Sequence, residues 1–94
     1  MGNDFNKKLK SYRDQINDID HELVDLLNER AEMVKKVKKL KQKENMPLYD
    51  ARREEELVEN IARYSKGPLY RDNIVQIFES ILRNVQILEK DETL

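Results

Sequence analysis

The chain has 94 residues, of which 38% are apolar and 39% are charged, so it fits one small domain, residues 1–94, with more charge than the usual value of about 25%. Eighteen basic and nineteen acidic residues give a net charge of −1, which provides no general attraction to nucleic acid or to an anionic membrane. The absence of cysteine excludes a disulfide framework, a thiol nucleophile and a thiolate metal site. A chain this short buries only about 60–65% of its unfolded surface, so we expect a partner chain to cover part of its apolar surface.

The helix-breaking residues of the sequence indicate three helices, and we expect no leader segment before them. Residues 1–8 lack the apolar core of a secretion signal, and no run approaches the ~20 apolar residues of a membrane span, so we expect a cytoplasmic protein. The glycines and prolines leave three long uninterrupted segments. Because apolar residues recur at three- and four-residue spacings, the sequence predicts an all-α fold.

The first predicted helix, about residues 4–43, carries a heptad pattern. Nine of the ten positions in two series spaced by seven are apolar or aromatic, and the exception is Arg30. Thirty-odd residues at ~1.5 Å each give roughly 50 Å, more than the width of a compact domain of this size. We therefore expect part of this stripe, the seam, to pack against another subunit. The seam consists of Leu9, Tyr12, Ile16, Ile19, Leu23, Leu26, Arg30, Met33, Val37 and Leu40.

Two shorter helices follow. Pro47 ends the first helix, and Asp50 offers a side-chain cap for a second helix at about residues 50–65. The third helix is predicted at about residues 70–89, where apolar residues again follow helical spacing.

Three cations are aligned along the first helix. Arg30 occupies a seam position, where an unpaired buried guanidinium would cost several kcal/mol, unless a carboxylate on a neighbouring helix pairs with it or its stem reaches the surface. Arg13 and Lys41 lie on the stripe beside the seam. Each alone is explained as a solvated or surface-paired side chain, and only their alignment with Arg30 indicates a shared role.

The second helix opens with another misplaced cation. Glu54 in its first turn suits the helix dipole, whereas the cation Arg53 does not.

His21 is interpreted as a surface residue without a role. Scattered carboxylates and one outward histidine form no metal site, so we expect no metal. Cations that face a core without a nucleophile or base suit a small dianion.

In the order and spacing of these residues, the chain resembles the all-helical class of chorismate mutases from about Leu9 to Glu89. The resemblance is carried by residues 12–20, residues 26–30, Lys41 and residues 50–54. It implies an intertwined homodimer of three-helix subunits. It also implies the Claisen rearrangement of chorismate to prephenate, in the biosynthesis of phenylalanine and tyrosine, without a cofactor.

The resemblance also implies residue roles. Arg13 would be contributed across the subunit interface, and Arg30 would bind a substrate carboxylate. Lys41 would reach a carboxylate and the ether oxygen, and Glu54, with the Asp50 backbone, would hold the ring hydroxyl. The remaining cation, Arg53, would add positive potential.

The third helix departs from the family pattern, which places a small residue and then, four residues later, a glutamine in the pocket. Val85 and Glu89 occupy these positions here. A glutamic acid donates a hydrogen bond to the ether oxygen only when protonated, so we expect activity to rise at mildly acidic pH. Gln86 is the alternative if the register differs, and a surface position for Glu89 also stays open.

Three other functions fit parts of the pattern. An isochorismate-pyruvate lyase would use similar cations, although Asp50, Arg53 and Glu54 together favour the mutase. A regulatory and dimerisation module of a shikimate-pathway enzyme fits the turn at Gly67-Pro68, which resembles fused members of the family. A plain helical interaction domain fits the heptads but leaves Arg30 unexplained.

Overall fold

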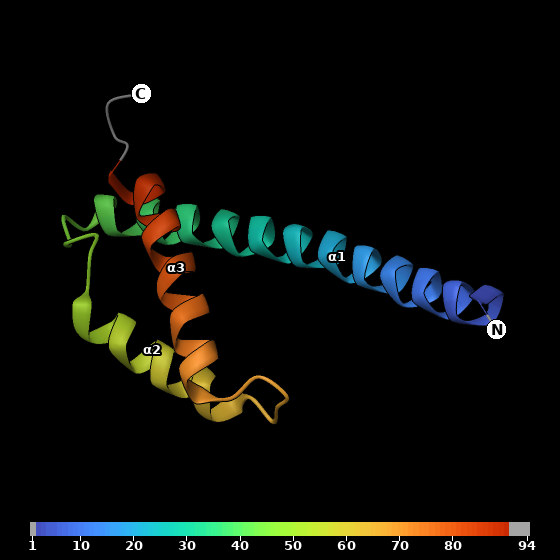
Figure 1. Cartoon of the computed structure of the whole chain (residues 1–94). Coiled ribbons are helices and arrows are strands. Elements are labelled where there is room, and N and C mark those ends of the chain that lie inside the picture. The colour runs from blue at the N-terminus through green and yellow to red at the C-terminus, as the bar shows by residue number, and fades with distance from the viewer. Residues whose placement is uncertain (1, 91–94) are drawn as a thin grey trace. The chain divides into compact units, whose positions relative to one another are not determined.

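The computed structural model describes the backbone of residues 2–90 and the side chains of residues 2–86. This part contains three helices and no strand: α1 (Gly2–Lys43), α2 (Ala51–Tyr64) and α3 (Arg71–Lys90) (Figure 1). The predicted all-α fold is confirmed, and each helix begins and ends within two residues of the expected positions. The chain divides into two units, residues 1–32 and 33–94, and each is described by itself. Within the described residues, no helix has the length and apolar composition that crossing a membrane requires.

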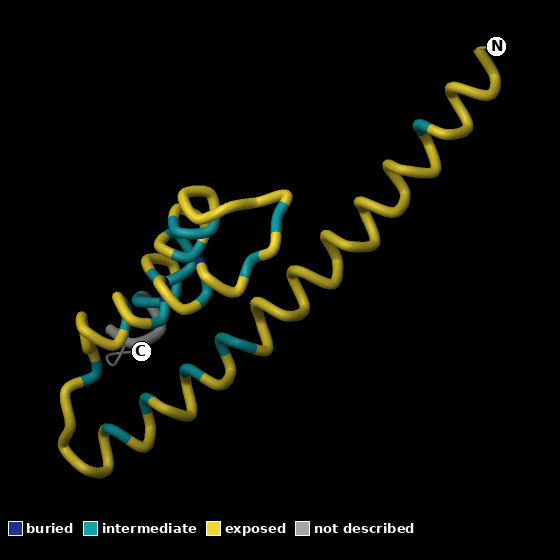
Figure 2. Tube along the Cα trace, turned by 90° about the horizontal axis from the view of Figure 1, so that it is seen from below, coloured by how far each residue is buried: buried dark blue, intermediate teal, exposed yellow. Residues whose placement is uncertain are grey.

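The first unit consists of α1 residues whose apolar stripe is uncovered. No described residue of α1 is buried (Figure 2). Most of the seam is more than half exposed, from Val37 at 51% to Leu40 at 67%, and Tyr12 in the first unit reaches 64%. On the polar face of α1, ion pairs between residues four apart stabilise the helix. An example is the pair of Lys10 and Asp14, whose Nζ and Oδ2 atoms are 2.8 Å apart. Amphipathic helices gain most of their stability from packing, and in the single chain this exposed stripe contributes little of it.

In the second unit, α2 and α3 pack against each other and run in opposite directions (Figure 1). Val58 and Ala62, one turn apart on α2, are the two buried apolar residues of the described chain. On α3, Ile74, Phe78 and Ile81 are half-buried. A core with two buried apolar side chains is thin even for a chain of this length.

A tight turn joins α2 to α3. The Ser65 hydroxyl accepts a hydrogen bond from the Gly67 backbone N–H at 3.4 Å and donates one to the Leu69 carbonyl. Gly67 has a φ of +86°, and the peptide bond to Pro68 is cis. The ring of Tyr70 lies against Gly67, with its Cζ atom 2.6 Å from where a Cβ would stand. The positive φ favours glycine at this position, because an L-residue would be strained there.

Gly67→Ala is therefore expected to lower the free energy of unfolding by about 1–2 kcal/mol or more. The backbone would be held in a region that costs an L-residue roughly this amount, and the new methyl group would also displace Tyr70. Thermal unfolding followed by circular dichroism measures the change. Gly2→Ala is the matched control, because a Cβ there meets no atom within 4 Å. An unchanged melting temperature in Gly67→Ala would contradict the account of this turn.

Candidate functional site

Lys41 lies in the last turn of α1 and is tied to the following connection at two points. Its backbone carbonyl accepts a hydrogen bond from the Met46 N–H at 2.8 Å. Its Nζ donates to the Leu48 carbonyl at 3.1 Å, and the side chain is partly buried. Among the described residues, this ammonium therefore has a neutral oxygen as its partner, so its charge is left for an anionic ligand.

The cap predicted for the second helix is confirmed. Asp50 adopts an extended conformation, with φ −134° and ψ 98°, and its carboxylate accepts a hydrogen bond from the Arg53 N–H. Its carbonyl accepts from the Glu54 N–H at 3.1 Å. The Arg53 side chain is exposed, whereas Glu54 is half-buried. The first turn of α2 thus holds three of the predicted site residues in fixed order.

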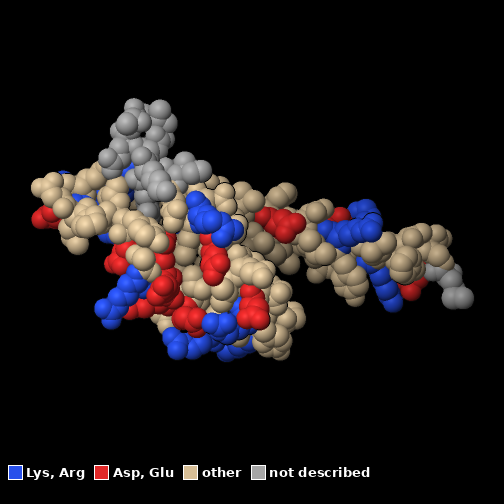
Figure 3. Space-filling model, turned by 60° about the vertical axis from the view of Figure 1, so that its left-hand side comes forward, with Lys and Arg blue, Asp and Glu red and all other residues tan. Residues whose placement is uncertain are grey.

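A groove of about 520 Å³ runs between α2 and α3 and is lined by both Glu54 and Gln86. Gln86 is one of six α3 residues in this lining, so its predicted role stays a prediction. The groove is acidic on balance: four glutamates line it, Glu54, Glu55, Glu59 and Glu79, against two arginines, Arg71 and Arg83. On the face of α2 and α3 drawn in Figure 3, acidic and basic side chains are intermixed. The predicted cations are not among its lining residues, so this groove alone would not bind a dianion.

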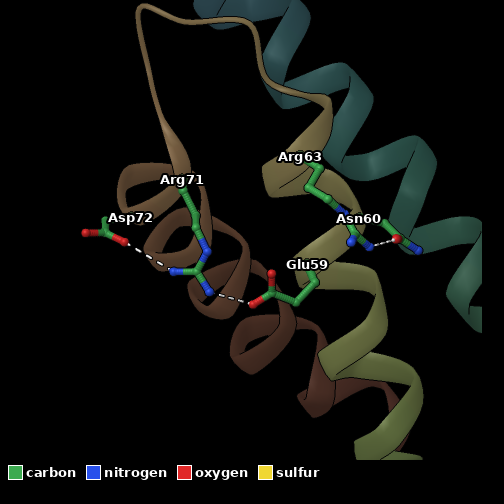
Figure 4. A network of polar contacts seen from close by, with 5 residues as sticks. All are labelled: Glu59, Asn60, Arg63, Arg71 and Asp72. Atoms are coloured by element: carbon green, nitrogen blue, oxygen red, sulfur yellow. Dashed lines mark hydrogen bonds and ion pairs between the residues drawn. The ribbon is translucent and has the colours of Figure 1, made fainter.

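Sequence reasoning missed Arg71, which links the two helices that form this groove. Its Nη2 lies 2.6 Å from the Glu59 carboxylate, and its Nη1 lies 3.3 Å from Asp72 (Figure 4). The hydrogen bond to Glu59, followed by the charge of that carboxylate, raises the pKa of Arg71. The sequence does contain a signal for Arg71. It is the first residue of α3, where the helix dipole disfavours a cation, and the same argument singled out Arg53.

Arg30, in the first unit, has one guanidinium nitrogen without a hydrogen-bond partner among the described residues. The residue is half-buried, and its Nη1 atom is buried without a hydrogen-bond partner among the described residues. Buried polar groups in folded proteins nearly always have a partner, and a buried charge without one is costly. The sequence left two explanations for Arg30, a pairing carboxylate or a side chain that reaches the surface. Neither of them describes this atom. An anionic ligand with two oxygens would satisfy it.

The remaining predicted residues are less constrained. Arg13 is exposed on the first unit, and Val85 is half-buried on α3. The side chain of Glu89 lies outside the described residues, so its predicted role stays a prediction. In the described part of the chain, no group of histidine, aspartate and glutamate side chains could hold a metal ion.

The comparisons with known proteins identify the family of the chain. A family model described as chorismate mutase type II matches residues 12–90, a range that includes every predicted site residue from Arg13 to Glu89. The chain belongs to the chorismate mutase type II family. The resemblance inferred from the order of the cations and acids is thereby confirmed at the level of the family.

Among relatives in the family, the chain is 36% identical over 88 residues to a bifunctional chorismate mutase/prephenate dehydratase from Aquifex aeolicus. The match covers 89% of this chain but 24% of that relative, so the chain spans about a quarter of the bifunctional protein. A chorismate mutase from Methanocaldococcus jannaschii is 28% identical, with 89% of this chain and 86% of the relative covered. A solved chorismate mutase from Thermus thermophilus superposes with a TM-score of 0.86 at 26% identity, covering 90% of this chain and 97% of that one.

Proposed function

We propose that this chain is a chorismate mutase, which converts chorismate to prephenate in the biosynthesis of phenylalanine and tyrosine. In this rearrangement the ether C–O bond of the enolpyruvyl group breaks while a new C–C bond forms, and no atom is gained or lost. The step needs no nucleophile and no cofactor. The observation that carries the proposal is the Nη1 atom of Arg30, which is buried without a partner among the described residues and lies within the range that matches the family.

The chemistry asks for conformer selection and charge stabilisation, and the proposed residues supply both. Chorismate carries two carboxylates, and a guanidinium binds a carboxylate with two parallel hydrogen bonds. In the proposed complex, Arg13 and Arg30 hold the compact conformer that brings the bond-forming carbons together. Negative charge grows on the ether oxygen as its bond breaks, and Lys41 stabilises that charge.

The second helix supplies the remaining groups in this proposal. Glu54, which is half-buried in the first turn of α2, accepts a hydrogen bond from the ring hydroxyl beside the Asp50 backbone. Arg53 is exposed and acts through its charge. An acceleration on the order of 10⁶ corresponds to about 8 kcal/mol, which conformer selection and one or two desolvated cationic contacts can supply.

The active species in this proposal is a homodimer in the cytoplasm. The exposed seam of α1 is an unpartnered heptad stripe, and such stripes pack against a second helix. A second copy of the chain offers the same stripe, so a two-fold dimer would cover both. In that dimer, Arg13 of one copy completes the pocket that contains Arg30 of the other.

The test is an assay of purified protein with chorismate across about pH 5 to 8, with identification of the product. Formation of prephenate supports the proposal. Unchanged chorismate at every pH contradicts it, and turnover of isochorismate would then assign the chain to the lyases. Thermal stabilisation by chorismate without turnover would instead indicate a regulatory module, while no stabilisation and no turnover would indicate an interaction domain.

Two variants separate the alternatives on α3. If Glu89 reaches the ether oxygen, its carboxyl must be protonated to donate, so kcat/KM should rise as pH falls and Glu89→Gln should flatten that profile. If Gln86 occupies that place, Gln86→Ala should lower kcat/KM by about tenfold at all pH values, while Glu89→Gln changes nothing. A Gln86→Ala variant with full activity and an unchanged pH profile in Glu89→Gln would exclude both assignments.

A further inference from the structure

The end of α1 is a six-residue turn, residues 41–46, whose fifth residue has a left-handed backbone conformation. Asn45 has a φ of +56°, which is the left-handed region that L-residues rarely adopt. Its N–H donates to the Gln42 carbonyl at 3.2 Å, and the Met46 N–H donates to the Lys41 carbonyl. These two bonds, of the 5→2 and 6→1 type, define a Schellman motif in which Asn45 is the left-handed residue. The helix therefore ends before Pro47 could interrupt it.

Two hydrogen bonds hold Lys41 in place, one to its backbone and one from its side chain. The Lys41 carbonyl is the acceptor of the 6→1 hydrogen bond, and its ammonium donates to the Leu48 carbonyl at 3.1 Å. The left-handed residue at position 45 turns the chain back, and three residues later the Leu48 carbonyl lies within hydrogen-bond distance of the Lys41 ammonium. A flexible lysine side chain with four rotatable bonds is thus anchored through a backbone conformation four residues away.

We infer that Asn45 is a positioning residue, which fixes the ammonium of Lys41 by holding the left-handed turn that presents the Leu48 carbonyl to it. The consequence for catalysis rests on the proposed function, in which Lys41 reaches the ether oxygen. Asparagine and glycine tolerate the left-handed region, alanine does so poorly, and a β-branched residue is a strong outlier there. The position thus offers a graded series of substitutions that removes no charged group.

The experiment compares Asn45→Gly, Asn45→Ala and Asn45→Val with two readouts. The ¹⁵Nζ chemical shift of Lys41 reports on its hydrogen bond and needs no substrate. It should be unchanged in Asn45→Gly and shifted in Asn45→Val. In the chorismate assay, kcat/KM should stay within about twofold in Asn45→Gly and fall by about 10- to 100-fold in Asn45→Val, mainly through kcat, because the misplaced ammonium no longer meets the developing charge. Asn45→Ala should fall between them, and it replaces Asn45→Val if that variant does not fold.

Two controls separate positioning from loss of stability. Gly67→Ala puts comparable backbone strain into the α2–α3 turn, which makes none of the hydrogen bonds to Lys41, and should keep kcat/KM within about twofold. In a Lys41→Ala background, adding Asn45→Val should cause no further loss of kcat/KM, because the group that it positions is already gone.

The outcomes are distinguishable from those of the proposed function. A wild-type protein that leaves chorismate unchanged overturns the mutase assignment, while the ¹⁵Nζ series still decides whether Asn45 positions Lys41. Asn45→Val with the wild-type ¹⁵Nζ shift, or with wild-type kcat/KM in an active enzyme, overturns the inference. A melting temperature that falls without either change would assign the turn a purely structural role.

Discussion

Arg30→Ala is expected to lower kcat/KM for chorismate by about 10²- to 5 × 10³-fold. Removing one partner of a desolvated, hydrogen-bonded charge pair costs about 3–5 kcal/mol, and each 1.4 kcal/mol is a factor of ten. In the proposed complex that pair is Arg30 and a substrate carboxylate. Steady-state kinetics of prephenate formation measures the loss.

The same substitution should leave the free energy of unfolding unchanged or raise it. In the free protein the Nη1 atom of Arg30 is buried without a partner among the described residues, so its removal relieves a desolvation cost and breaks no hydrogen bond made by that atom. Loss of activity together with retained or increased stability is the signature of a binding group. A strongly lowered melting temperature in Arg30→Ala would contradict this interpretation of the site.

Two further arginine variants serve as controls. Arg30→Lys keeps the charge but loses the bidentate geometry, so its kcat/KM should lie between those of the wild type and Arg30→Ala. Arg63→Ala removes a guanidinium that is exposed on α2 and donates to Asn60 at 2.7 Å, and it should change kcat/KM less than twofold. Equal losses in Arg63→Ala and Arg30→Ala would indicate a general effect of charge.

A mixture of two inactive variants, Arg13→Ala and Arg30→Ala, is expected to recover activity. If each pocket takes Arg30 from one copy and Arg13 from the other, a heterodimer has one pocket with both changes and one with neither. At equal expression half of the dimers are mixed, so about a quarter of the wild-type pockets is restored. Co-expression followed by kinetics on the purified mixture measures this recovery.

The matched control mixes Arg30→Ala with Lys41→Ala. In the proposed arrangement one chain contributes both Arg30 and Lys41 to a pocket. Every pocket of the mixed dimer therefore carries a change, and activity should stay low.

Leu26→Lys tests the dimer itself, because it puts a charge on a seam residue that is 59% exposed in the single chain. This variant should be monomeric in analytical ultracentrifugation. No recovery from Arg13→Ala with Arg30→Ala in a proven dimer would place Arg13 in the pocket of its own chain.

Much of the fold could be predicted from local sequence signals. The three helices follow from apolar spacing and from breakers, and Asp50 caps α2 as its side-chain chemistry predicts. The sequence assigns the end of α1 to Pro47, whereas in the structure the helix ends in a turn whose left-handed residue is Asn45. Both residue types can end a helix. Proline does so more consistently, because asparagine adopts the left-handed region only in some contexts.

The sequence by itself determined the helices, the exposed heptad stripe and the presence of a cation at a seam position, because these depend on periodicity and residue type along one segment. Only the tertiary structure decided that Arg30 has a buried atom without a partner among the described residues, that Glu54 and Gln86 line one groove, and that Arg71 pairs with Glu59. Burial and ion pairing depend on which distant residues meet, and residue spacing along a helix does not specify its neighbour across a groove. The candidate site was therefore recognisable by its residues, while their contacts had to come from the fold.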